Sequence, residues 1–149
     1  MTTIFESLRA DHNRQRALAD ELVGTTGASD ERTSLFARLR VELHAHAVAE
    51  ERHFYVPLMQ DDLTQEKARH SIAEHHEIDE LIEQLEGYQL AASQWLVTAR
   101  ALHHKVHHHL DEEEQEVFQL AGKVLTETAK SSLAGDYEAE MRTQRDAQS

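Results

Sequence analysis

Two histidine–glutamate pairs stand out in the sequence because each could place two metal ligands on one face of a helix. His46 is followed four residues later by Glu50, and His109 is followed four residues later by Glu113. Side chains at this spacing lie one turn apart on the same side of a helix. Imidazole nitrogens and carboxylate oxygens suit divalent first-row metals. The two pairs therefore predict a metal site between helices.

Two further histidines, His12 and His75, lie on the apolar rows of the segments that precede these pairs. Together the six residues would bring four imidazoles and two carboxylates into one interior. Each unpaired polar group there would cost about 1–3 kcal/mol, and a bound cation removes that cost. One tetrahedral zinc ion takes four ligands, so six are too many for a single closed zinc site. Two ions fit better, with Glu50 and Glu113 as bridges and two histidines on each ion.

An internal repeat with an offset of 63 residues, from His12 to His75, relates the two halves of this set. The repeated segments are Ala10-Asp11-His12 with Ala73-Glu74-His75, His44-Ala45-His46 with His107-His108-His109, and Glu50-Glu51 with Glu113-Glu114. The apolar positions Leu18, Leu22, Leu39 and Leu43 recur as Leu81, Leu85, Leu102 and Val106. This duplication predicts two similar helical hairpins that close one core.

Apolar spacing predicts four long helices, over about residues 3–23, 31–59, 64–86 and 93–120. Thr3 and Glu6 form a capping-box motif at the first start, Gly87 is a stop signal, and Pro57 should bend or fray the second helix. The expected fold is all-α, an up-down-up-down four-helix bundle of residues 1–125 built from two repeated hairpins. The amphipathic pattern of residues 126–149 predicts a short fifth helix that packs on the bundle and frays at its end.

Composition restricts the class of protein. The 149 residues include five glycines, one proline and no cysteine, which favours helix and excludes disulfides and cysteine-held iron–sulfur clusters. A formal net charge of −13 repels phosphate, so neither nucleic acid nor an acidic membrane surface is an expected partner. Without a signal pattern or a membrane-length apolar run, a cytoplasmic protein is expected. The twelve histidines are far more than such a chain usually carries.

The motifs resemble those of the hemerythrin-like, or HHE cation-binding, domains. The resemblance covers about residues 1–125 and rests on an acidic residue before two histidines, His-x3-Glu-Glu twice, and Phe54-Tyr55-Val56-Pro57. It implies two non-heme iron ions, bridged by oxo, hydroxo or water, that bind or react with O2, peroxide or nitric oxide. The implied ligands are His12, His46, Glu50, His75, His109 and Glu113. A monomer or weak homodimer is expected.

Two features depart from the oxygen-carrying hemerythrins. Those proteins have a second histidine four residues from the one in the third helix, where this chain has Ser71 and Asp79. Their last carboxylate corresponds to Glu114, whereas the internal repeat favours Glu113. Fewer nitrogen ligands favour redox, sensing or peroxide chemistry over simple O2 carriage. The sequence leaves open whether Glu114, His76 or Asp79 binds metal, and whether the chain is a catalase- or peroxidase-like oxidoreductase.

Three other functions are compatible with parts of the pattern. An iron or oxygen sensor would couple metal occupancy to stability and partner binding. A ferritin-like site requires Glu-x-x-His from two helices, but only Glu50 and His53 fit, since the repeat mate of His53 is Glu116. A metal-free interaction bundle would tolerate leucine at His46 and His109.

The remaining aromatic and imidazole side chains are assigned to the core or to the surface. Tyr55 is expected near enough to the six residues to donate a hydrogen bond to one of them. Phe54, Trp95 and Phe118 are expected as core residues. The histidines expected at the surface are His44, His53, His70, His103, His104, His107 and His108.

Overall fold

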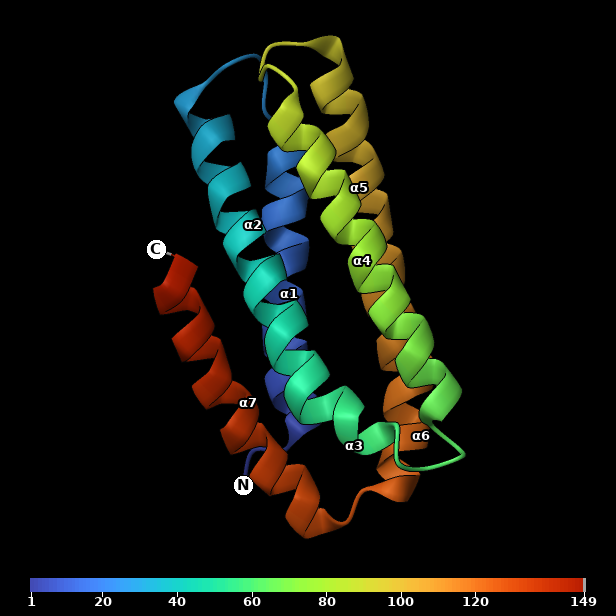
Figure 1. Ribbon diagram of the computed structural model, residues 1–149. Helices are drawn as coiled ribbons and strands as arrows, with labels where there is room; N and C mark the ends of the chain where they lie inside the picture. The colour runs from blue at the N-terminus through green and yellow to red at the C-terminus, as the bar shows by residue number, and fades with distance from the viewer. Residues whose placement is uncertain (149) are drawn as a thin grey trace.

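The computed structural model describes residues 1–148 and contains no strand in this range. Its long helices are α1 (Ile4–Val23), α2 (Asp30–Glu50), α4 (Gln65–Gly87), α5 (Ser93–Glu112) and α7 (Glu127–Gln148). Helices α1, α2, α4 and α5 alternate in direction, and each packs against two of the others (Figure 1). The all-α, up-down-up-down bundle with a fifth helix is confirmed.

Helix ends follow the signals in the sequence. The Thr3 hydroxyl accepts a hydrogen bond from the Glu6 amide at 3.3 Å, and the Glu6 carboxylate accepts one from the Thr3 amide at 3.1 Å. This capping box satisfies amide groups that the first turn leaves free. Gly87 is the last residue of α4, as predicted. Gly27, in the first connection, adopts the left-handed φ of 59° that glycine tolerates best.

The two helices that carry the candidate glutamates, α2 and α5, each widen into a π-helical turn at that residue. The turn η1 (Glu51–Tyr55) follows Glu50 and leads into α3 (Val56–Leu58), which contains Pro57. The turn η2 (Glu113–Val117) begins at Glu113 and leads into α6 (Phe118–Val124). A π turn contains more residues than an α turn, so two consecutive side chains of each segment are buried: Phe54 with Tyr55, and Val117 with Phe118. The burial of Phe54 and Phe118 agrees with their expected place in the core.

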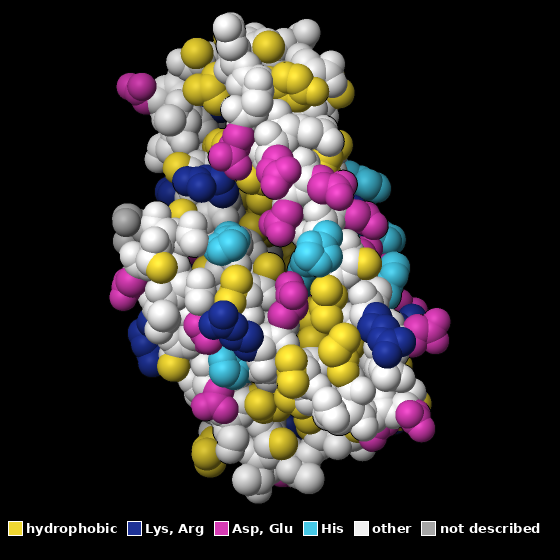
Figure 2. All heavy atoms as spheres, viewed as in Figure 1, with side chains coloured by type: hydrophobic (Ala, Val, Ile, Leu, Met, Phe, Trp, Pro, Cys, Tyr) yellow, Lys and Arg dark blue, Asp and Glu magenta, His cyan; other side chains and the backbone are white. Residues whose placement is uncertain are grey.

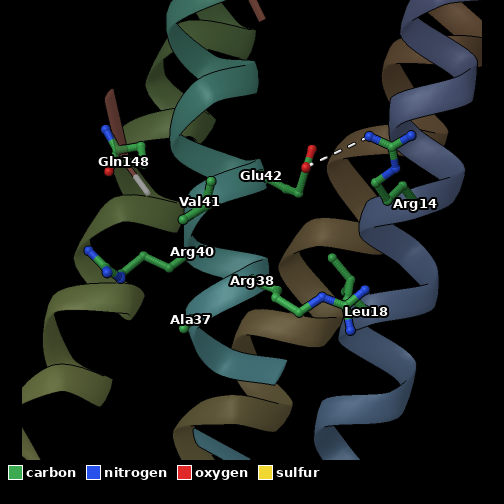
Figure 3. A pocket seen from close by; sticks show the side chains of 8 residues that line it. All are labelled: Arg14, Leu18, Ala37, Arg38, Arg40, Val41, Glu42 and Gln148. Atoms are coloured by element: carbon green, nitrogen blue, oxygen red, sulfur yellow. Dashed lines mark ion pairs between the residues drawn. The ribbon is translucent and has the colours of Figure 1, made fainter. Parts of the chain in front are cut away.

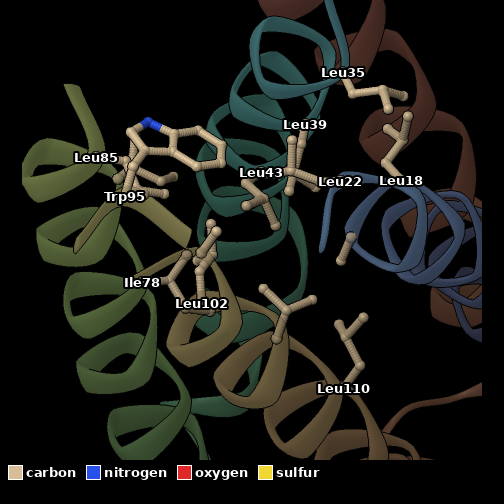
Figure 4. Packing of buried hydrophobic residues seen from close by; sticks show 14 residues of the cluster. Leu18, Leu22, Leu35, Leu39, Leu43, Ile78, Leu85, Trp95, Leu102 and Leu110 are labelled. Carbon is tan, nitrogen blue, oxygen red and sulfur yellow. The ribbon is translucent and has the colours of Figure 1, made fainter. Parts of the chain in front are cut away.

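Two apolar clusters fill the interior on either side of a polar layer. Cluster 1, drawn in Figure 4, includes Leu18, Leu22, Leu39, Leu43, Ile78, Trp95, Leu102 and Val106. Cluster 2 includes Ile4, Leu8, Ala49, Phe54, Tyr55, Leu58, Val117, Phe118 and Tyr137. Along α1, His12 lies between Leu8 of cluster 2 and Leu18 of cluster 1. The chain therefore surrounds its candidate ligands with apolar packing.

The fifth helix is longer than the sequence suggested. Helix α7 has 22 residues and packs along α1 and α2 rather than against α4 and α5 (Figure 1). It buries Ala134, Tyr137 and Met141. The predicted boundary between the bundle and the C-terminal segment, near residue 125, remains a prediction. The helix continues to Gln148, and Ser149, where fraying was expected, lies outside the described residues.

The surface shows acidic and histidine side chains intermixed on one face of the molecule (Figure 2). A surface pocket of about 340 Å³ lies between α1, α2 and the end of α7 (Figure 3). Its lining includes Arg14, Arg38 and Arg40 but no histidine, so it is not part of the polar layer. Over residues 1–148, no helix combines the length and the apolar character that a bilayer crossing requires.

Glu140 makes the stability of α7 and of its contact with Arg52 of η1 dependent on pH. Hydrogen bonds from Gln144 and Arg52 hold the pKa of Glu140 at about 2, below its usual value. The stabilisation is complete above the unfolded-state pKa near 4.5 and is lost as pH falls toward 2. We expect Glu140→Gln to lower the free energy of unfolding at pH 7 by up to about 1 kcal/mol, and by less at pH 3.

Urea denaturation of both proteins at pH 7 and pH 3 measures this difference. Glu80→Gln, at an exposed position of α4, is the control and should have no pH-dependent effect. A destabilisation by Glu140→Gln that grows on acidification would contradict the assignment.

Candidate metal centre

The six predicted residues meet in the polar layer between the two apolar clusters. His12 comes from α1, His46 and Glu50 from α2, His75 from α4, and His109 and Glu113 from α5 and the start of η2. Their exposed fractions do not exceed 5%. The ligand atoms form two overlapping groups, each within 4.8 Å, of which one is His12, His46, Glu50 and Glu113 and the other is Glu50, His75 and His109.

The atoms that face one another in this layer have no hydrogen-bond partner. They are the Nε2 atoms of His12, His46, His75 and His109, both carboxylate oxygens of Glu50, and Oε1 of Glu113. Such buried polar atoms are rare in folded proteins, because each unpaired one costs about 1–3 kcal/mol. A cation bound between them would remove that cost. This observation, rather than the residue types alone, indicates a metal centre.

Distances in the layer match those between ligands of a shared ion. Glu50 Oε1 lies 3.3 Å from His46 Nε2 and 3.1 Å from His75 Nε2. Glu113 Oε1 lies 3.3 Å from His12 Nε2, and its Oε2 lies 3.4 Å from His109 Nε2. Ligands about 2.0–2.2 Å from one ion lie roughly 3.0–3.5 Å from each other. Each carboxylate therefore faces histidines of both groups, as a bridge between two ions would.

The outward nitrogen of each histidine, Nδ1, is hydrogen-bonded. Three of these nitrogens donate to carboxylates: His12 to Glu114 at 2.7 Å, His75 to Glu51 at 2.9 Å, and His109 to Glu74 at 2.8 Å. An ionised carboxylate only accepts, so each of these Nδ1 atoms carries a proton, and each Nε2 can offer a lone pair to a cation once it has lost its own proton. Such partners orient metal-binding histidines and raise their basicity.

The fourth histidine, His46, is linked to a carboxylate through the hydroxyl of Tyr137. This chain of two hydrogen bonds is called the Tyr137 relay below. Glu51 and Glu114 are repeat mates, and so are Asp11 and Glu74, so symmetry would pair His46 with Asp11. Because aspartate is one methylene shorter than glutamate, a hydroxyl from α7 joins the two groups. His46 Nδ1 donates to the Tyr137 hydroxyl at 2.7 Å, and that hydroxyl donates to Asp11 at 2.7 Å.

Tyr55 contributes a second buried hydroxyl at the layer. Its hydroxyl donates a hydrogen bond to Oε2 of Glu113, which confirms its expected position near the six residues. The repeat mate of Tyr55 is Phe118, whose ring stacks on His12 with centroids 5.9 Å apart. Both rings are buried at the π turns, and at this pair of positions the two halves of the layer differ by one hydroxyl.

Charge interactions hold protons in the layer when no cation is present. Burial by itself would lower the pKa of His75, but the carboxylates of Glu50 and Glu51 raise it to about 10. Burial also opposes protonation of His12, yet Glu113, Glu114 and Glu50 raise its pKa well above the usual value. Burial and the nearby charge of Glu50 raise the pKa of Glu113. A metal ion would displace these protons, so binding should release acid.

A small cavity adjoins the layer. It has a volume of about 10 Å³ and is lined by His46, His75, His109 and apolar side chains that include Leu43 and Ile78. Its lining also includes Gln15, which is 1% exposed and whose Nε2 has no hydrogen-bond partner. A space of this size holds one water-sized molecule.

The structure shows where the residues lie whose part in metal binding the sequence left open. Glu114 faces the outward nitrogen of His12 and an Arg16 guanidinium, so it lies behind the histidine. His76 is exposed, and Asp79 lines the small cavity from α4. His53 lies 3.3 Å from Glu140 of α7 rather than near Glu50, which is unlike a ferritin-like arrangement.

Comparison with known proteins gives the family. A sequence profile described as the hemerythrin HHE cation-binding domain matches residues 3–121. The chain belongs to the hemerythrin HHE cation-binding family. A crystal structure of an HHE cation-binding domain-containing protein from Mycobacterium kansasii has the same fold, with a TM-score of 0.89 and 22% identity. The match covers 99% of this hemerythrin-like chain and 90% of the other. A search of curated proteins finds no match.

Sequence reasoning missed most of the partners behind the histidines in this HHE domain. Glu51 and Glu74 appear in the sequence analysis only as parts of repeated motifs, and Tyr137 lies in the segment predicted as the fifth helix without an assigned role. The repeat could have indicated these partners. Glu51 with Glu114, and Asp11 with Glu74, recur at the same sequence separations from the histidines in both halves. Nothing in the sequence placed Tyr137 opposite His46.

The Tyr137 relay predicts a stability loss. Tyr137→Phe would leave the Asp11 carboxylate and His46 Nδ1 without the hydroxyl that joins them. We expect the free energy of unfolding of the metal-free protein to fall by about 1–3 kcal/mol, measured by urea denaturation. Tyr88→Phe, at a residue that is 38% exposed, is the matched control and should change little. Equal effects of the two substitutions would show that the relay does not stabilise the fold.

Proposed function

We propose that this chain is a non-heme di-iron protein that binds or reacts with O2 or related small oxidants, namely peroxide or nitric oxide. The supporting observation is the set of unpartnered Nε2 and carboxylate atoms between the two apolar clusters. Membership of a cation-binding family supports the same assignment.

In this proposal His12 and His46 would hold one ion, His75 and His109 would hold the other, and Glu50 and Glu113 would contribute carboxylate ligands to both. The carboxylates and Tyr137 behind the histidines fix the ring orientations and keep protons on Nδ1. When bound, ferrous ions would supply electrons and an open coordination position for a small ligand. Tyr55 donates a hydrogen bond to Glu113, which would limit that carboxylate's freedom to move.

The protein side of the centre selects ligands by size and polarity. The adjoining cavity of about 10 Å³ has room for about one water-sized molecule, so only small ligands could be accommodated there with slight movement of the side chains. Leu43, Ile78 and Val106 in its lining keep bulk water away, while the Gln15 amide gives it one polar donor. This combination suits a diatomic or peroxide ligand better than an organic substrate. A cytoplasmic location and a monomeric or weakly dimeric state remain part of the proposal.

Iron loading and colour test the proposal. We expect anaerobically loaded protein to hold two iron ions per chain and to develop a new near-ultraviolet or visible absorption band when O2 or peroxide is added. His46→Leu and His109→Leu should each lose bound iron, because each removes a nitrogen ligand. His104→Leu, on the exposed side of α5, should retain it. A metal content unaffected by His46→Leu and His109→Leu, or no spectral change with any oxidant, would refute the proposal.

Metal removal should also destabilise the bundle. Iron that binds only the folded chain adds about 2.7 kcal/mol at a free concentration 100-fold above Kd. We expect the melting temperature to fall when a chelator removes iron, and loading of metal-free protein in weak buffer to release protons. Differential scanning calorimetry and a pH electrode measure the two effects. Identical melting curves with and without iron would contradict the assignment of the polar layer as a metal centre.

A further inference from the structure

We propose a second cation site on the surface of the bundle, formed by Asp20 of α1 and His103 and His107 of α5, that takes Zn²⁺ or a similar divalent first-row ion. It uses none of the six interior residues. Sequence reasoning placed both histidines at the surface without a function. The site therefore does not depend on what the interior layer binds.

The geometry of the three side chains supports this assignment. His103 and His107 are four residues apart on α5, so they stand one turn apart on one face. Their rings lie 4.4 Å apart between centroids. Both Nε2 atoms point at one oxygen of the facing helix: Asp20 Oδ1 is 2.7 Å from His103 Nε2 and 2.9 Å from His107 Nε2. Three ligand atoms of suitable type thus lie within 4.8 Å of one another.

The donor set suits zinc. Two imidazole nitrogens and one carboxylate oxygen are common protein ligands of Zn²⁺, and a water molecule would complete a tetrahedron. Ligands of one zinc ion lie roughly 3.3 Å apart, so the nitrogens and the oxygen need to separate by only about half an ångström. The side chains of His103, His107 and Asp20 are 32%, 29% and 59% exposed, which leaves room for that adjustment and a path for the ion.

The internal repeat does not produce the same set twice. The mates of Asp20, His103 and His107 are Glu83, Arg40 and His44. Arg40 in place of a histidine removes a ligand and adds a positive charge, so these repeat-related positions on α2 and α4 cannot form an equivalent site. On the same helix, His104 and His108 also lie four residues apart, but their rings are 6.4 Å apart and they share no carboxylate on α1. His104 therefore provides a matched control.

Zinc binding to the full chain tests the proposal. Equilibrium dialysis against ⁶⁵Zn²⁺ should show one more zinc ion per chain in the wild type than in His103→Ala or Asp20→Asn. In both variants we expect affinity for that ion to fall at least tenfold, while His104→Ala keeps it. All four proteins have the same interior residues, so zinc bound by the interior layer contributes equally and cancels.

A thermal measurement gives an independent readout. Because the ion would join α1 to α5, Zn²⁺ should raise the melting temperature of the wild type and of His104→Ala by more than that of Asp20→Asn. Equal zinc stoichiometry in the wild type and in both site variants would overturn the proposal. So would a loss in His104→Ala as large as that in His103→Ala, since it would indicate binding to exposed histidines in general.

Discussion

The structure depends on one constraint, which is that polar atoms buried between two apolar clusters face one another without partners. Four imidazole nitrogens, both carboxylate oxygens of Glu50 and Oε1 of Glu113 occupy a layer that an ordinary core would fill with leucine or valine. Their unpaired state is costly, and it is tolerated because apolar packing on both sides and hydrogen bonds behind the histidines hold the rings in place. A cation held by these atoms would remove that cost, and folding and metal binding would then be linked.

The duplicated hairpins make the layer nearly symmetric, but the two halves are not equivalent. Three differences at repeat-related positions lie beside the layer: Asp11 against Glu74, Tyr55 against Phe118, and Gln15 against Ile78. Each changes a polar contact beside the ligands: the Tyr137 relay on His46, the hydroxyl on Glu113, and the polar donor in the small cavity. Two ions in this layer, as proposed above, would therefore have different surroundings.

Helix α7 takes part in this asymmetry. It packs on α1 and α2, the first hairpin, where the shorter Asp11 leaves space for the Tyr137 hydroxyl. Arg145 of the same helix bonds the second oxygen of Asp11 and also Glu42, so the relay is anchored at the surface. The fifth helix thus holds His46 and Asp11 in place through hydrogen bonds, and it also packs against apolar residues of the bundle.

The sequence by itself determined the bundle and the six inward residues, because helical spacing places His46 with Glu50 and His109 with Glu113 on one face and the repeat duplicates that face. It also determined the family, whose motifs are local. Only the tertiary structure decided the π turns that bury Tyr55, and the pairing of Tyr137 with His46. These features depend on how segments distant in the chain pack together, and a one-dimensional pattern contains no information on the distance between such segments.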